Sequence, residues 1–102
     1  MNNSKHIDLT DDQLETVKLI LKQVIPKKTV CVFGSRITGT ARKYSDLDLA
    51  IISDEPISLS IQAELNEAFS ESNLPFKVDV VDWATASESF QKIILNNKII
   101  IQ

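Results

Sequence analysis

The chain has 102 residues, a formal net charge of −3, 43% hydrophobic residues and 25% charged residues. This length suits one domain with its own core and excludes a second, substrate-reading domain. The acidic balance gives no general attraction to nucleic acid, so direct nucleic-acid binding is not expected. No apolar run approaches the roughly 20 residues that cross a bilayer. The polar start, MNNSKHIDL, has no apolar signal core, so a cytoplasmic protein is expected.

The N-terminal part predicts a leader followed by a helix. Residues 1–9 are expected to form a flexible leader within a single domain that covers 1–102. Thr10-Asp11-Asp12-Gln13 has the form of a capping box, so a helix is expected to begin near Asp11. Apolar residues recur at helical spacing from Leu14 to Val24, and Pro26 ends the helix. This helix is expected to pack on a sheet and carries no chemistry.

The first strand is predicted from Val30 to Phe33, a β-branched and aromatic run that stops at Gly34. Cys31 lies inside this run and is the only cysteine, so we interpret it as a small buried hydrophobe. An internal disulfide is impossible. A zinc site is excluded because His6 is also the only histidine.

The turn after this strand combines residues that suit a phosphate. Gly34 can adopt backbone angles that other residues avoid and permits close approach to the chain, while Ser35 offers a hydroxyl and a backbone N–H. A short helix or single turn is expected directly afterwards, with its N-terminal N–H groups toward the anion. Arg36, Arg42 and Lys43 then place three positive charges together. Binding of phosphate or of a partner remains open for them, and so does a solvated loop.

Acidic residues mark the next two strands. Residues 45–52, SDLDLAII, alternate before becoming wholly apolar, so they predict a strand that enters the core with Asp46 and Asp48 on one face. Their Cα atoms would lie roughly 6 to 7 Å apart. Asp79 sits in another strand-like run, and it completes a cluster of three carboxylates if the two strands are adjacent. Hard oxygen ligands of this kind suit Mg²⁺. Strand capping by these carboxylates is the alternative.

The remaining elements are predicted from apolar spacing and caps. A helix is expected between these two strands, with Ile61, Leu65, Ala68 and Phe69 on its buried side. Asp82 is expected beyond the Asp79 strand, as a turn or cap residue. Thr85 to Glu88 reads as another capping box, and Phe90, Ile93 and Ile94 give the last helix an apolar face. The final run, Ile99-Ile100-Ile101, is expected to add an edge strand or to contact a partner. The order predicts a small α/β domain whose sheet is covered by helices.

These residues together resemble a known family. Gly34-Ser35, a ten-residue spacer, Asp46-x-Asp48 and the later Asp79 are similar to the signature of the DNA polymerase beta-like nucleotidyltransferase superfamily. Gly34-Ser35-Arg36, Gly39, Ala41-Arg42 and the 45–50 segment most resemble the MntA-like minimal nucleotidyltransferases, which are encoded beside HEPN-domain toxins. The resemblance covers roughly 30–83 and implies a mixed sheet.

The resemblance also implies an activity. Asp46, Asp48 and Asp79 would be catalytic and would bind Mg²⁺, two ions in all, while Gly34, Ser35, Arg36 and Ser45 would hold ATP, the nucleotide donor. AMP would pass to a hydroxyl, a tyrosine in this subfamily, of a HEPN RNase toxin, so that the chain acts as its antitoxin. Two alternatives remain open at this point: a binding-only antitoxin without catalysis, and a stand-alone nucleotidyltransferase that modifies a small molecule.

Overall fold

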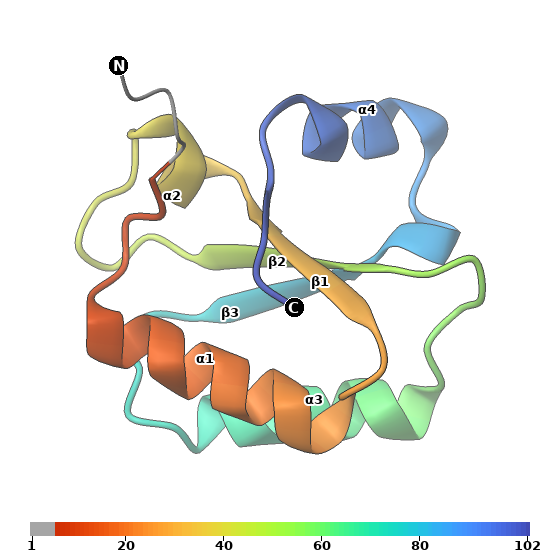
Figure 1. Ribbon diagram of the computed structural model, residues 1–102, viewed down its shortest axis with the longest axis horizontal. Coiled ribbons are helices and arrows are strands. Elements are labelled where there is room, and N and C mark those ends of the chain that lie inside the picture. Colours follow the sequence, from red (N-terminus) through yellow and green to blue (C-terminus); the bar gives the residue numbers. More distant parts are fainter. Residues whose placement is uncertain (1–5) are drawn as a thin grey trace.

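The computed structural model describes residues 6–102, which form a single α/β layer structure around one mixed sheet (Figure 1). In chain order the elements are α1 (Asp11–Val24), β1 (Thr29–Phe33), α2 (Ser35–Thr38), β2 (Leu47–Ile52), α3 (Leu59–Ser70), β3 (Val78–Asp82), the 3-10 turn η1 (Trp83–Thr85), α4 (Glu88–Asn96) and β4 (Ile99–Ile100). The expected small α/β domain with a mixed sheet is therefore confirmed.

The sheet has the strand order β3-β2-β1-β4. β1 pairs antiparallel with both β2 and β4, whereas β2 and β3 are parallel. The parallel pair needs a crossover, and α3 supplies it between β2 and β3. β2 and β1 are thus the central strands, and β3 and β4 form the two edges.

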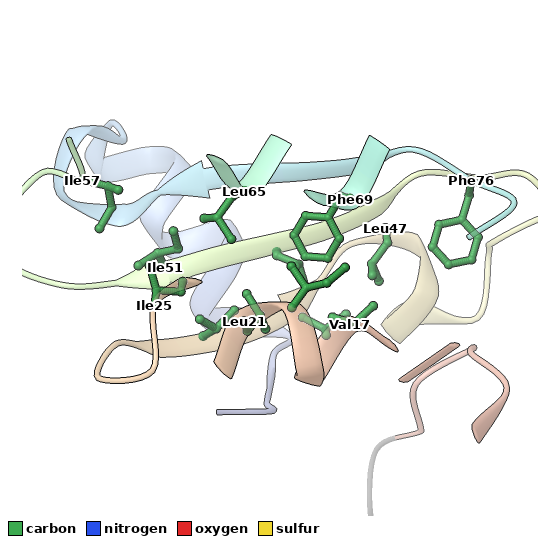
Figure 2. Packing of buried hydrophobic residues seen from close by; sticks show 13 residues of the cluster. Val17, Leu21, Ile25, Leu47, Ile51, Ile57, Leu65, Phe69 and Phe76 are labelled. Atoms are coloured by element: carbon green, nitrogen blue, oxygen red, sulfur yellow. The ribbon is translucent and has the colours of Figure 1, made fainter. Parts of the chain in front are cut away.

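Alternation along the strands sends side chains to two separate cores. One face, with Leu47, Leu49 and Ile51 of β2, packs against α1 and α3, as Figure 2 shows. The opposite face carries a smaller cluster around Cys31, Phe33, Ala50 and Ile94, which α4 covers. Cys31 is fully buried, as expected, and burial raises the pKa of its thiol.

The N-terminal region follows its local signals. Thr10 caps α1 through a capping box: its hydroxyl accepts from the Gln13 N–H, and the Gln13 side-chain oxygen accepts from the Thr10 N–H. Of the leader expected to be flexible, residues 1–5 lie outside the described residues. Ile7 and Leu9 pack against the larger core, and the Asp8 N–H donates to the Arg36 carbonyl at 2.8 Å. This part of the leader is held against the domain.

Two expectations for the C-terminal region are corrected. The last helix is capped by Ser87, whose hydroxyl accepts from the Phe90 N–H, and the capping box expected from Thr85 is wrong. Thr85 belongs to η1 instead, where its hydroxyl donates to the Asp82 carbonyl. Ile93 was expected on the buried face but is 58% exposed, because α4 turns the Phe90 and Ile94 side toward the sheet.

The C-terminal run forms the expected edge strand. Ile99 and Ile100 pair with Val32 and Cys31 of β1. The Gln102 side chain then donates to the carbonyls of Ile25 and Lys28, which fixes the tail beside the end of α1. Among the helices of residues 6–102, none has the length and apolar character that crossing a membrane requires.

Candidate functional site

The two carboxylates expected on neighbouring strands lie directly beside each other. Asp48 of β2 and Asp79 of β3 are register partners in the parallel pair, and adjacent strands lie about 4.8 Å apart. Ala50 and Val81, two residues further along these strands, belong to the core under α4. Because side chains alternate, Asp48 and Asp79 face that same side of the sheet. The expected adjacency of the two strands is confirmed.

Asp46 lies just outside the sheet. The strand was expected to begin at Ser45 but begins at Leu47, because Ser45 is bound into the preceding loop. Asp46 therefore precedes the strand by one residue, and its side chain is exposed. It still lies at the same end of β2 as Asp48. Its negative charge is one of the causes that raise the pKa of the Asp48 carboxyl.

Three carboxylates at this end of the sheet, those of Asp46, Asp48 and Asp79, repel one another. Burial raises the pKa of the Asp48 carboxyl above its ordinary value, and the neighbouring charges of Asp79 and then Asp46 raise it further. Asp48 is half-buried, whereas Asp46 and Asp79 are exposed. Within residues 6–102, no three acidic, histidine or cysteine side chains already surround a point where a metal ion would sit.

Gly34 is required by this arrangement. It directly follows β1, whose last residue, Phe33, is the register partner of Asp48. Its φ is +82° and its ψ −154°, a conformation in which other residues are strained. A Cβ added there would lie 3.1 Å from Cγ and 3.3 Å from Cβ of Asp48, and would overlap its Oδ2. The sequence suggested close approach of a ligand at Gly34, and in the structure the Asp48 carboxylate makes such an approach.

The turn after Gly34 is the single helical turn expected there. α2 is four residues long and ends at Gly39, which has a φ of +83°. The Ile37 and Thr38 N–H groups donate to the Gly34 carbonyl, at 3.0 Å and 3.2 Å. The half-buried Ser35 side chain makes no hydrogen bond to the rest of 6–102, nor does its backbone N–H. Both donors beside Gly34 thus remain available to a ligand.

Arg36 has a different position from the one expected of a phosphate ligand. It is 5% exposed and lies 4.1 Å over the Phe76 ring. Its Nε and Nη2 donate to the Ser45 carbonyl at 3.2 Å and 2.8 Å, and its Nη1 donates to the Asp8 carbonyl at 2.8 Å. Nη2 also reaches the carbonyl of Lys43. These contacts favour a structural role, in which Arg36 holds the loop that leads to Asp46.

Ser45 is part of the same loop. Its hydroxyl accepts from the Arg42 N–H at 2.8 Å, and its backbone N–H donates to the Arg42 carbonyl at 3.1 Å. Arg42 and Lys43 are exposed, in keeping with a solvated loop. The expected nucleotide-binding set therefore divides: Gly34 and Ser35 border the carboxylates, whereas Arg36 and Ser45 fix the loop between them.

Asp82 is the cap residue that its position suggested, although it is the last residue of β3 and not beyond it. Its Oδ1 accepts from the Ala84 N–H at 3.2 Å, and its Oδ2 accepts from the Ile57 N–H at 2.9 Å. The second bond ties the start of α3 to the end of β3. Both carboxylate oxygens thus accept hydrogen bonds from backbone N–H groups, as expected of a cap residue.

With this geometry in place, comparison with known proteins identifies the family. The model of the family "Polymerase beta, Nucleotidyltransferase" matches residues 5–102. The chain belongs to this nucleotidyltransferase family. Within it, the chain is 51% identical over 102 residues to "Probable protein adenylyltransferase MntA" of Haemophilus influenzae, a match that covers 100% of this chain and 90% of the relative. The resemblance expected from the Gly-Ser and Asp-x-Asp residues is confirmed.

Solved structures of the nucleotidyltransferase family share the fold. A crystal structure of a toxin–antitoxin with AMP-PNP matches at a TM-score of 0.72 with 26% identity, over 85% of this chain and 70% of that one. A tri-AMPylated Shewanella oneidensis HEPN toxin in complex with MNT antitoxin matches at a TM-score of 0.64 with 25% identity, over 85% of this chain and 66% of that one.

Proposed function

We propose that this nucleotidyltransferase is an antitoxin that transfers AMP from ATP to a tyrosine hydroxyl of a HEPN-domain toxin. The single observation that carries the proposal is the placement of Asp48 beside Asp79, directly against the Gly34-Ser35 turn. The 51% identity to a probable protein adenylyltransferase supports the reaction class. The neighbouring structures, which hold toxin–antitoxin complexes, support the partner. The reaction would take place in the cytoplasm.

The acidic residues suit Mg²⁺. They are hard oxygen donors, they repel one another, and a divalent cation would neutralise that repulsion. We propose that Asp46, Asp48 and Asp79 hold the metal, two ions when the nucleotide is bound. When bound, Mg²⁺ supplies charge stabilisation for the attacking and leaving oxygens of a nucleotidyl transfer.

The chain's own residues then position the reactants. The Ser35 hydroxyl and backbone N–H would donate to the phosphates of ATP, and Gly34 would leave room for them. The acceptor oxygen attacks the α-phosphorus, a new O–P bond forms, and the bond to the β-phosphate oxygen breaks to release pyrophosphate. Asp79, on the outer strand, would accept the hydroxyl proton on a carboxylate oxygen. Such chemistry depends mainly on positioning and charge stabilisation.

The acceptor is assigned to another protein because the neighbouring structures hold toxin–antitoxin complexes, one of them with a tri-AMPylated HEPN toxin. Arg36 and Ser45 would contribute indirectly, since they hold the loop before Asp46.

Mass spectrometry of the partner tests the proposal. The purified chain would be incubated with ATP, Mg²⁺ and the cognate HEPN-domain protein, and the partner's intact mass and tryptic peptides measured. We expect an added AMP on a tyrosine, absent when Asp46→Ala/Asp48→Ala replaces the wild type. A tight complex with an unmodified partner would instead establish the binding-only antitoxin, and AMP on a small hydroxyl compound alone would establish the stand-alone enzyme.

A further inference from the structure

The outer edge of β3 has the features of a docking site for an extended peptide segment. β3 is an edge strand, and β2 is the only strand of the described chain that pairs with it. The Leu47 N–H donates to the Lys77 carbonyl at 2.9 Å. Because backbone groups alternate in direction along a strand, those of Asp79 and Val81 also point toward β2. The N–H and C=O groups of Val78 and Val80 therefore point outward, as an unpaired row.

A groove lies along this edge. It has a volume of about 540 Å³ and is bounded by Asn66, Phe69 and Ser70 of α3 and by residues 78–80 of β3. A second hollow of about 230 Å³ shares Asn66 and Val80 and continues toward Asp82 at the end of the strand. The larger volume lies in the range of ligand-binding clefts, roughly 300 to 1,000 Å³. The groove thus follows the unpaired row of backbone groups.

The position of Asp79 at the border of the groove indicates which molecule binds there. Asp79 is one of the residues that line the groove. Its carboxylate, which faces the α4 side of the sheet, is the group proposed to receive the acceptor's proton. The opposite edge strand, β4, lies two strands away from β2 and has only two residues. A segment that pairs with β3 would place every second side chain on the α4 side of the sheet, beside the Asp79 carboxylate, and the others in the groove on the α3 side. A segment on β4 would reach neither.

We propose that the segment of the acceptor protein that carries the modified hydroxyl binds in this groove, as an additional strand on β3. Backbone hydrogen bonds to Val78 and Val80 give affinity, and the α3 side of the groove receives alternate side chains. The inference rests on the proposed function, because the acceptor is defined by AMP transfer. It adds where a protein acceptor binds and how it is recognised.

A pair of α3 variants tests the groove. Asn66→Trp fills it from an exposed helix position, and Glu67→Trp, also exposed, adds the same side chain one residue along, outside the groove. With the cognate HEPN-domain protein as acceptor, we expect Asn66→Trp to raise the KM for the acceptor about tenfold or more, with the KM for ATP unchanged. Glu67→Trp should match the wild type. Equal behaviour of the two variants, or a rise in the KM for ATP instead, would overturn the inference.

Amide hydrogen exchange gives a second test that needs no catalysis. The Val78 and Val80 N–H groups should exchange about tenfold or more slowly when the acceptor protein is bound. The Val81 N–H, already directed toward β2, serves as the internal reference. Unchanged exchange at Val78 and Val80 in a formed complex would place the acceptor elsewhere. Docking with slowed exchange but no AMP transfer by the wild type would refute the proposed function and leave the groove assignment standing.

Discussion

Replacement of Gly34 by alanine tests whether the turn after β1 needs a glycine because the Asp48 carboxylate packs against it. The strained backbone is expected to cost about 1 to 3 kcal/mol, and displacement of the Asp48 side chain a further 0.5 to 1.5 kcal/mol. Gly39→Ala is the matched control: its φ is also positive, at +83°, but an added Cβ meets nothing within 4 Å. That control should lose only about 1 to 2 kcal/mol.

The two ranges overlap, so the decisive quantity is the coupling to Asp48. Unfolding free energies from urea denaturation, followed by circular dichroism, would be measured for Gly34→Ala with and without Asp48→Ala. If the added Cβ meets the carboxylate, the cost of Gly34→Ala should fall by about 0.5 to 1.5 kcal/mol in the Asp48→Ala background. The cost of Gly39→Ala should be the same in both backgrounds. Zero coupling at Gly34 would refute the contact on which the site geometry rests.

Three further outcomes are expected. Arg36→Lys should lower the free energy of unfolding by about 3 kcal/mol, because buried carbonyls lose charged donors. The Kd of the folded protein for Mg-ATP, measured by calorimetry, should change by less than about threefold. A larger loss of nucleotide affinity would support a phosphate-binding role for Arg36. In metal-free buffer, Asp48→Asn should stabilise the protein near neutral pH and have little effect at acid pH. The pKa of the Asp48 carboxyl is raised on folding, so wild-type stability falls as the pH rises from the pKa of the unfolded chain through that of the folded chain. Urea titrations from pH 3 to 8 in which wild-type stability rises over this interval would contradict this electrostatic account. Ser87→Ala should cost about 1 kcal/mol and Thr85→Ala less, if Ser87 is the true cap of α4; thermal denaturation would contradict the assignment if the order were reversed.

The elements set by local signals could be predicted from the sequence. The capping box at Thr10 and Pro26 fix α1, and the stop at Gly34 fixes the end of β1. The sequence left the adjacency of Asp48 and Asp79 conditional, because a helix between two short strands permits a parallel pair but does not establish that the two strands are neighbours. Asp46 was assigned to the strand because the alternation continues through it, and only the loop contacts of Ser45 show that the strand begins later.

The features of the fold and of the site that the sequence did not predict depend on contacts between residues distant in the chain. Arg36 reads as a phosphate ligand beside Gly34-Ser35, but the Asp8 carbonyl that it binds lies 28 residues away and leaves no local signal. The second bond of Asp82, to the Ile57 N–H, spans 25 residues. At α4, Thr85 and Ser87 both offer a cap hydroxyl, and the 3-10 turn that consumes Thr85 decides between them. The free edge of β3 follows only from the strand order.

The central claim, that these carboxylates transfer a nucleotidyl group to a protein, is tested most directly by following the two ends of ATP. Parallel reactions would contain ATP labelled on the α- or the γ-phosphate, Mg²⁺, the cognate HEPN-domain protein and either the wild-type chain or Asp46→Ala/Asp48→Ala. The account predicts that the α label appears on the partner, that the γ label leaves as pyrophosphate, and that the variant gives neither. Transfer of the γ label to the partner, or an α label that persists with the variant, would contradict it.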